Sequence, residues 1–175
     1  MASAVPLEIF ISLTGIVLLT PIFQPEQDSY IDEITASKYI SNINVYIIRI
    51  VYSLVSLVAL ISIFSLYMKL SGSDVTMLLW LGAIATAMFL GSIGLFTAAI
   101  SGNIAVSYMV PVIYYALNFG GNQLGNFYLF SMMGGDYEPK IWLFAGSLLL
   151  LTLSIFVKWI LYGRFEAAIM KRICR

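Results

Sequence analysis

The longest uncharged run in the chain constrains its fold most strongly. Residues 75–135 contain no Asp, Glu, Lys or Arg. A helix needs only about 20 residues to cross the roughly 30 Å hydrocarbon core of a bilayer, so this run is too long for one crossing. It is interrupted by Ser101-Gly102-Asn103, a sequence typical of a tight turn between helices. We therefore predict two membrane spans here, at 76–100 and 104–118.

Charged residues bracket three further apolar stretches, which we predict as spans at 8–23, 46–68 and 141–161. Apart from Arg49 and Lys158 near span ends, we expect no charged residue inside a span. The expected fold class is all-α, with residues 1–175 forming a single transmembrane domain. It is a polytopic membrane helix bundle of about five transmembrane helices, with a short cytosolic amphipathic helix and a re-entrant or interfacial extracellular segment.

Composition supports a membrane protein and excludes several functions. The chain is 61% hydrophobic and 10% charged, whereas soluble domains are about 45–50% apolar and about 25% charged. Nine acidic and nine basic residues cancel, so no basic field is available for nucleic acid. The chain has no histidine, its one cysteine is Cys174, and it contains no P-loop motif. We therefore expect no enzyme activity, no cofactor and no metal.

Basic residues predict the orientation. The C-terminal tail carries Arg164, Lys171, Arg172 and Arg175 against the single acid Glu166, which places the tail in the cytoplasm. Counting back five spans puts the N-terminus outside, the 24–45 segment inside and the 119–140 segment outside. The predicted localisation is the plasma membrane, with several crossings and lipid as a surrounding partner.

The 24–45 segment follows the first span, which we expect to end at Thr20-Pro21 because proline is disfavoured within a helix. Ser29 and Asp32 fit a helix N-cap with an acid three residues later, and Ile31 and Ile34 would share one face. A short amphipathic helix on the membrane surface and a solvated connecting loop both fit. The sharper hypothesis is a docking element for a cytosolic partner, with an acidic surface formed by Glu26, Asp28, Asp32 and Glu33.

A second unusual segment lies between Pro111 and Lys140. It is too apolar for an ordinary loop and is interrupted by glycines, and irregular backbone at membrane depth must be buried in protein or line a wet cavity. A short re-entrant or interfacial helix near 122–133 is expected. The candidate translocation path comprises Tyr114, Tyr115, Asn118, Asn122, Gln123 and Asn126. The alternative is an aromatic interfacial belt of Tyr114, Tyr115, Phe127, Tyr128 and Phe130.

Small residues recur every four positions along the third span. Ala83, Ala87 and Gly91 form one set, and a second set follows at Gly94, Ala98 and Gly102. This spacing lets another helix approach closely, either within the chain or between subunits.

Three stretches resemble a known family. Thr20-Pro21-Ile22-Phe23 with Pro25-Glu26-Gln27, Lys38 and Arg49 is similar to the cytosolic loop of ABC-2-type permease subunits. Residues 101–118 resemble the fifth span of that family, and the segment before the last span resembles its re-entrant extracellular helices. The family usually has six spans, whereas we expect five here, and the first of the six is the one without an expected counterpart.

The resemblance implies the membrane-spanning permease subunit of an ATP-driven exporter. Its partners would be a cytosolic ATP-binding subunit and a second permease subunit, in a homodimer or a heterodimer. Coupling to the ATPase would use Glu26, Asp28, Ile31, Asp32, Glu33 and Ile34. The alternative function is a non-transporting scaffold or assembly protein that binds another membrane subunit through Ala83, Ala87 and Gly91.

Overall fold

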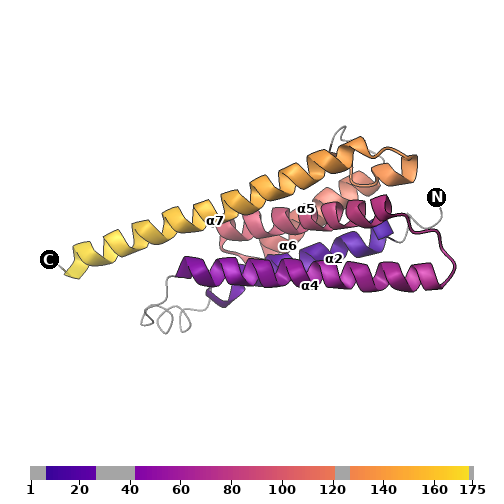
Figure 1. The fold of residues 1–175 in the computed structure, drawn as a ribbon. Coiled ribbons are helices and arrows are strands. Elements are labelled where there is room, and N and C mark those ends of the chain that lie inside the picture. The colour runs from indigo at the N-terminus through magenta and orange to yellow at the C-terminus, as the bar shows by residue number, and fades with distance from the viewer. Residues whose placement is uncertain (1–6, 27–41, 121–126, 174–175) are drawn as a thin grey trace.

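The computed structural model describes residues 7–26, 42–120 and 127–173, with side chains described for 7–23, 44–120 and 127–160. Every regular element in these ranges is a helix, and none is a strand, as the sequence predicts. Successive long helices lie alongside one another and run in alternating directions (Figure 1). The described chain therefore begins at one end of the bundle, and α7 ends beyond the other.

The first helical stretch is composite. It opens with the π-helix η1 (Leu7–Ile11), continues as α2 (Ser12–Leu19) and ends as the 3₁₀ helix η2 (Thr20–Glu26). The α-helix thus ends directly before Thr20-Pro21, as predicted, because the proline ring disfavours a continuing α-helix.

The remaining helices follow the predicted spans closely. They are α4 (Asn42–Leu70), α5 (Met77–Ser101), α6 (Ile104–Phe119) and α7 (Glu138–Ile173). The predicted turn between α5 and α6 is confirmed, since Gly102 adopts a left-handed conformation with φ of 60°. The Asn103 side chain then caps α6 by accepting a hydrogen bond from Ala105 N at 2.9 Å. By contrast, α7 starts before the predicted span at 141–161 and continues past its end.

Among the described residues, three helices are long and apolar enough to cross a bilayer, namely Asn44–Leu70, Met77–Ser101 and Glu138–Ile160. The predicted spans at 8–23 and 104–118 correspond to the shorter apolar helices Leu7–Phe23 and Ile104–Phe119. The outward faces of α4 and α7 carry many exposed aliphatic and aromatic side chains. An apolar exterior of this extent suits a membrane-embedded helix bundle.

Helix α5 lies at the centre of the bundle and packs against α2, α6 and α7 (Figure 1). The approach of α2 is very close: a methyl group added at Gly15 would lie 1.8 Å from Ala87 O, and one added at Gly91 would lie 2.5 Å from Gly15 O. Ala83 and Ala87 are fully buried. The predicted close helix packing is therefore confirmed within the chain.

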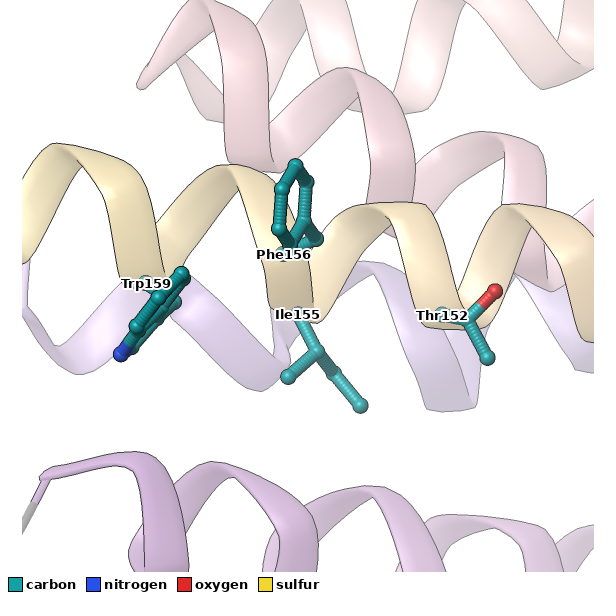
Figure 2. Close-up of a pocket in the computed structure, with 4 residues that line it drawn as sticks. All are labelled: Thr152, Ile155, Phe156 and Trp159. Carbon is teal, nitrogen blue, oxygen red and sulfur yellow. The ribbon is translucent and has the colours of Figure 1, made fainter.

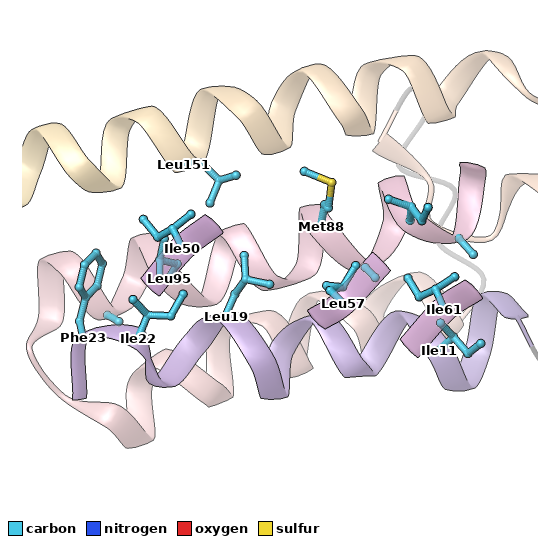
Figure 3. Close-up of a cluster of buried hydrophobic side chains, with 14 of the residues drawn as sticks. Ile11, Leu19, Ile22, Phe23, Ile50, Leu57, Ile61, Met88, Leu95 and Leu151 are labelled. Atoms are coloured by element: carbon cyan, nitrogen blue, oxygen red, sulfur yellow. The ribbon is translucent and has the colours of Figure 1, made fainter. Parts of the chain in front are cut away.

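A hydrophobic core fills the space between the first helical stretch, α4 and α5. Ile50, Leu57 and Ile61 of α4 belong to this core together with Leu19 and Leu95 (Figure 3). Leu151 of α7 points into the same core. These contacts fix both ends of the first helical stretch, where the polar side chains described next are found.

Candidate functional site

A buried ion pair joins the start of the first helical stretch to the start of α7. Lys140 Nζ lies 2.6 Å from Glu8 Oε1. Glu8 is 1% exposed and Lys140 is 6% exposed. Glu8 and Lys140 lie at the boundaries of the predicted spans 8–23 and 141–161, so the expectation that Arg49 and Lys158 are the only charges inside the spans stays a prediction. In the sequence, Glu8 and Lys140 border apolar stretches. In the folded chain they lie between helices, where each neutralises the charge of the other.

The polar groups of this pair find further partners. Met132 N and Met133 N donate to Glu8 Oε1 and Oε2, each at 3.2 Å. Lys140 also donates to Thr86 Oγ1 at 2.9 Å and to Leu129 O. Glu8, Thr86 and Leu129 thus take the three N–H donors of the ammonium group. A buried ion pair contributes favourably only when its remaining hydrogen bonds are made in this way.

Asn118 extends the same network from the end of α6. Its Oδ1 accepts a hydrogen bond from Leu129 N at 3.2 Å, and its Nδ2 donates to Tyr114 O at 3.0 Å. The Tyr114 hydroxyl donates to Phe127 O at 2.7 Å. We call Glu8, Thr86, Asn118 and Lys140 the Glu8 clamp.

The clamp holds an irregular segment, residues 127–137, which we call the strap. The strap contains the 3₁₀ helix η4 (Ser131–Gly134) and turns into α7 through Gly135, whose φ is 86°. Leu129, Phe130 and Met132 of the strap are buried. A short re-entrant or interfacial helix is predicted near 122–133. Residues 121–126 lie outside the described residues, and the described remainder has 3₁₀ geometry at residue 127, a turn at 129–130 and then η4.

Three of the predicted path residues, Tyr114, Tyr115 and Asn118, are described, and all three bind their own chain. The Tyr115 hydroxyl donates to Ile9 O at 3.1 Å, whereas Tyr114 and Asn118 hold the strap. Asn122, Gln123 and Asn126 lie outside the described residues, and the path remains a prediction. Phe130, a member of the alternative aromatic belt, is only 3% exposed and contacts Tyr115 edge-on at 5.5 Å.

A second group of contacts lies at the opposite end of the first helical stretch. The ring of Phe23 is buried, meets Tyr46 edge-on at 5.1 Å, and has Lys158 Nζ 5.0 Å from its centroid. Arg49 Nη1 donates to Ile22 O at 3.4 Å. A cation over an aromatic face is attracted by the ring quadrupole. We call Ile22, Phe23, Tyr46, Arg49 and Lys158 the Phe23 cluster.

The predicted coupling residues lie in the segment that this cluster frames. Ile22 and Phe23 precede residues 27–41 along the chain, and Tyr46 and Arg49 follow them. Glu26 ends η2, and its side chain is not among those described. Asp28, Ile31, Asp32, Glu33 and Ile34 lie outside the described residues, so the predicted docking element is untested.

An open apolar hollow of about 320 Å³ lies on α7, lined by Thr152, Ile155, Phe156 and Trp159 (Figure 2). The Thr152 hydroxyl is directed to its own helix, where it donates to Leu149 O at 2.8 Å. The hollow therefore offers almost no polar group that could orient a ligand. Among the side chains that the structure describes, no three His, Cys, Asp or Glu residues come together as metal ligands.

Comparisons with protein-family models, with curated proteins and with solved structures found no match to this chain. The likeness to ABC-2-type permeases therefore rests on the quoted sequence stretches alone.

Proposed function

We propose that the chain is a membrane-spanning permease subunit of an ATP-driven exporter, with its ATPase on a separate cytosolic polypeptide. In this proposal five helical segments cross the plasma membrane, with the N-terminus outside and α7 ending in the cytoplasm. Residues 1–175 form one transmembrane domain, and lipid surrounds it. A second permease subunit completes the translocation path.

The alternating directions of the helices support five crossings. Helix α6 has 16 residues, and at about 1.5 Å per residue it would extend roughly 24 Å. A span slightly shorter than the bilayer core is accommodated by local thinning at modest cost. The first apolar helix, Leu7–Phe23, is also shorter than the three long helices. It nevertheless runs beside α5 for most of its length (Figure 1).

The Phe23 cluster is the observation that carries the proposal. Ile22, Phe23 and Arg49 belong to the stretch that resembles the permease loop, and they meet at one end of the bundle. Lys158 of α7 contacts the same phenylalanine ring. A displacement of residues 24–41 would therefore reach the first helical stretch, α4 and α7 together. Such a position suits a segment that receives movement from an ATPase.

The docking chemistry follows from the sequence of that segment. The acidic residues Glu26, Asp28, Asp32 and Glu33 would orient a basic groove on the ATPase, since complementary charge guides association. Exposed ion pairs contribute only about 0–1 kcal/mol each, so apolar contacts must supply most of the affinity. Ile31 and Ile34 would provide them.

The path in this proposal lies between two permease subunits. Tyr114, Tyr115 and Asn118 make their hydrogen bonds within the chain, and the core between the described helices is filled with apolar side chains. The alternative, a scaffold that binds through Ala83, Ala87 and Gly91, is less well supported because α2 already covers that face.

Co-purification and transport test the proposal together. A tagged chain, extracted in mild detergent, should retain a polypeptide with a P-loop, and inverted membrane vesicles should show ATP-dependent uptake of the exported compound. The variant I31S/I34S should lose transport more severely than E33Q, while membrane insertion is unchanged in both. Recovery of the chain without any P-loop polypeptide would favour the scaffold. Full transport by I31S/I34S would show that residues 24–45 are a passive loop.

A further inference from the structure

We propose that the Glu8–Lys140 ion pair is a releasable latch, which holds the strap closed and lets it leave the bundle as one unit when the pair separates. This inference concerns the folded chain and does not depend on the exporter proposal. Its observations are the hydrogen bonds of the strap, the glycines at its end and the way in which the pair joins its contacts.

The strap is held mainly through its backbone by side chains from other elements. Asn118 binds Leu129 N, Lys140 binds Leu129 O, and Tyr114 binds Phe127 O. Glu8 accepts both Met132 N and Met133 N. None of these bonds is part of a helix ladder. The strap can therefore separate while α5, α6 and α7 keep their own hydrogen bonds.

The chain provides a flexible junction at the α7 end of the strap. Gly134 and Gly135 are exposed, and a methyl group added at either would meet no atom within 4 Å. Gly135 already adopts a positive φ, and glycine crosses between backbone conformations with little steric cost. Rotation at these positions can move the strap without displacing α7.

The ion pair links the contacts into one cooperative unit. Separation of Glu8 from Lys140 withdraws the acceptor of two strap N–H groups and frees the ammonium that binds Leu129 O. The buried polar groups would then lack partners and favour water over the apolar interior. The buried side chains of Leu129, Phe130 and Met132 oppose release of the strap. The labelling experiment distinguishes a strap held by the polar network from one held by these apolar side chains.

Ser131 is a suitable reporter of strap position. It is 4% exposed, and its Oγ has no hydrogen-bond partner among the described residues. Cysteine at this position is nearly isosteric and should be protected from a maleimide while the strap is closed. Gly134 is the matched exposed control, and Ser92, fully buried in α5, reports opening of the bundle itself.

The experiment measures maleimide labelling rates of purified protein in lipid nanodiscs, where both faces are accessible. Each variant carries C174S and one new cysteine: S131C, G134C or S92C. K140M should raise the S131C rate by about tenfold or more, the change expected when local opening becomes at least 1.4 kcal/mol easier. The rate of G134C should stay constant, and S92C should remain protected. E8Q, which preserves side-chain volume, should act in the same direction.

Two results would overturn the proposal. If S131C stays protected in both K140M and E8Q, apolar side chains hold the strap and the ion pair is no latch. If S92C becomes reactive together with S131C, the whole bundle opens and the strap is not a separate unit. Should K140M fail to fold, E8Q and the charge-free double variant E8M/K140M carry the same comparison.

Discussion

The first helical stretch is joined to α7 at both of its ends, by very different chemistry. At one end, Glu8 and Lys140 form a buried ion pair with all three ammonium donors occupied. At the other end, Lys158 lies 5.0 Å from the centre of the neutral Phe23 ring, and Arg49 Nη1 donates to Ile22 O at 3.4 Å. Lys140 and Lys158 belong to the same helix and are separated by roughly 27 Å along its axis, at about 1.5 Å per residue.

This difference indicates where the bundle is stiff and where it can adapt. A buried pair that loses one partner leaves an uncompensated charge, whereas a cation over a ring can shift with little loss. The Glu8 clamp therefore fixes the strap end, while the Phe23 cluster tolerates displacement beside residues 27–41. An adaptable end next to residues 27–41 is what the proposed coupling to an ATPase requires.

The largest effect is expected from breaking the clamp. K140M leaves Glu8 buried without its counter-charge, and we expect a loss of about 3–5 kcal/mol in the free energy of unfolding. The measurement is unfolding in mixed detergent and SDS micelles, followed by tryptophan fluorescence. K69M is the matched control, because Lys69 is exposed at the end of α4 and should change stability by less than about 0.5 kcal/mol. Equal stability of K140M and K69M would contradict the clamp.

An intermediate effect is expected midway between the two ends. G15A introduces a methyl group 1.8 Å from Ala87 O, and backbone cannot move aside as a flexible side chain does. Overpacking of this kind typically costs about 1–3 kcal/mol, measured in the same unfolding assay. G134A adds the same methyl group where no atom lies within 4 Å and should be nearly neutral. If G15A and G134A have the same free energy of unfolding, α2 and α5 are not in close contact.

The smallest effect is expected at the Phe23 cluster. K158M removes the cation over the ring but keeps a side chain of similar length, so the unfolding free energy should fall by only about 0.5–1 kcal/mol. A loss as large as that of K140M would remove the distinction between the two ends. Arginine at this position should restore most of the difference, since guanidinium also binds aromatic faces.

Local features of the fold could be predicted from the sequence, and distant pairings could not. The Ser101-Gly102-Asn103 turn and the helix end at Pro21 follow from the conformations that glycine and proline prefer, and both are observed. The Glu8–Lys140 pair escaped prediction because its members lie near opposite ends of the sequence and each borders an apolar stretch. The available signal was their opposite charge on the same predicted side of the membrane.

The strap is a second case in which the local sequence predicts the kind of backbone but not its distant partners. Its glycines and apolar residues predict irregular backbone or a short re-entrant or interfacial helix. The structure shows buried Leu129, Phe130 and Met132, and the re-entrant helix stays a prediction. Nothing in the local sequence indicates that a carboxylate from the beginning of the chain binds its N–H groups. The polarity of Asn118 predicts a path residue, which stays a prediction, and does not indicate that its Oδ1 accepts a hydrogen bond from Leu129 N of the strap.

The central claim is that the Glu8–Lys140 pair couples the first helical stretch to α7 more strongly than the Phe23–Lys158 contact does. Two double-mutant cycles measure this difference most directly. One cycle combines E8M with K140M, and the other combines F23L with K158M, each read as unfolding free energy in the same micelles. The coupling energy should be about 2–3 kcal/mol for Glu8 with Lys140 and below about 1 kcal/mol for Phe23 with Lys158. Equal coupling energies, or a larger one for Phe23 with Lys158, would contradict this account.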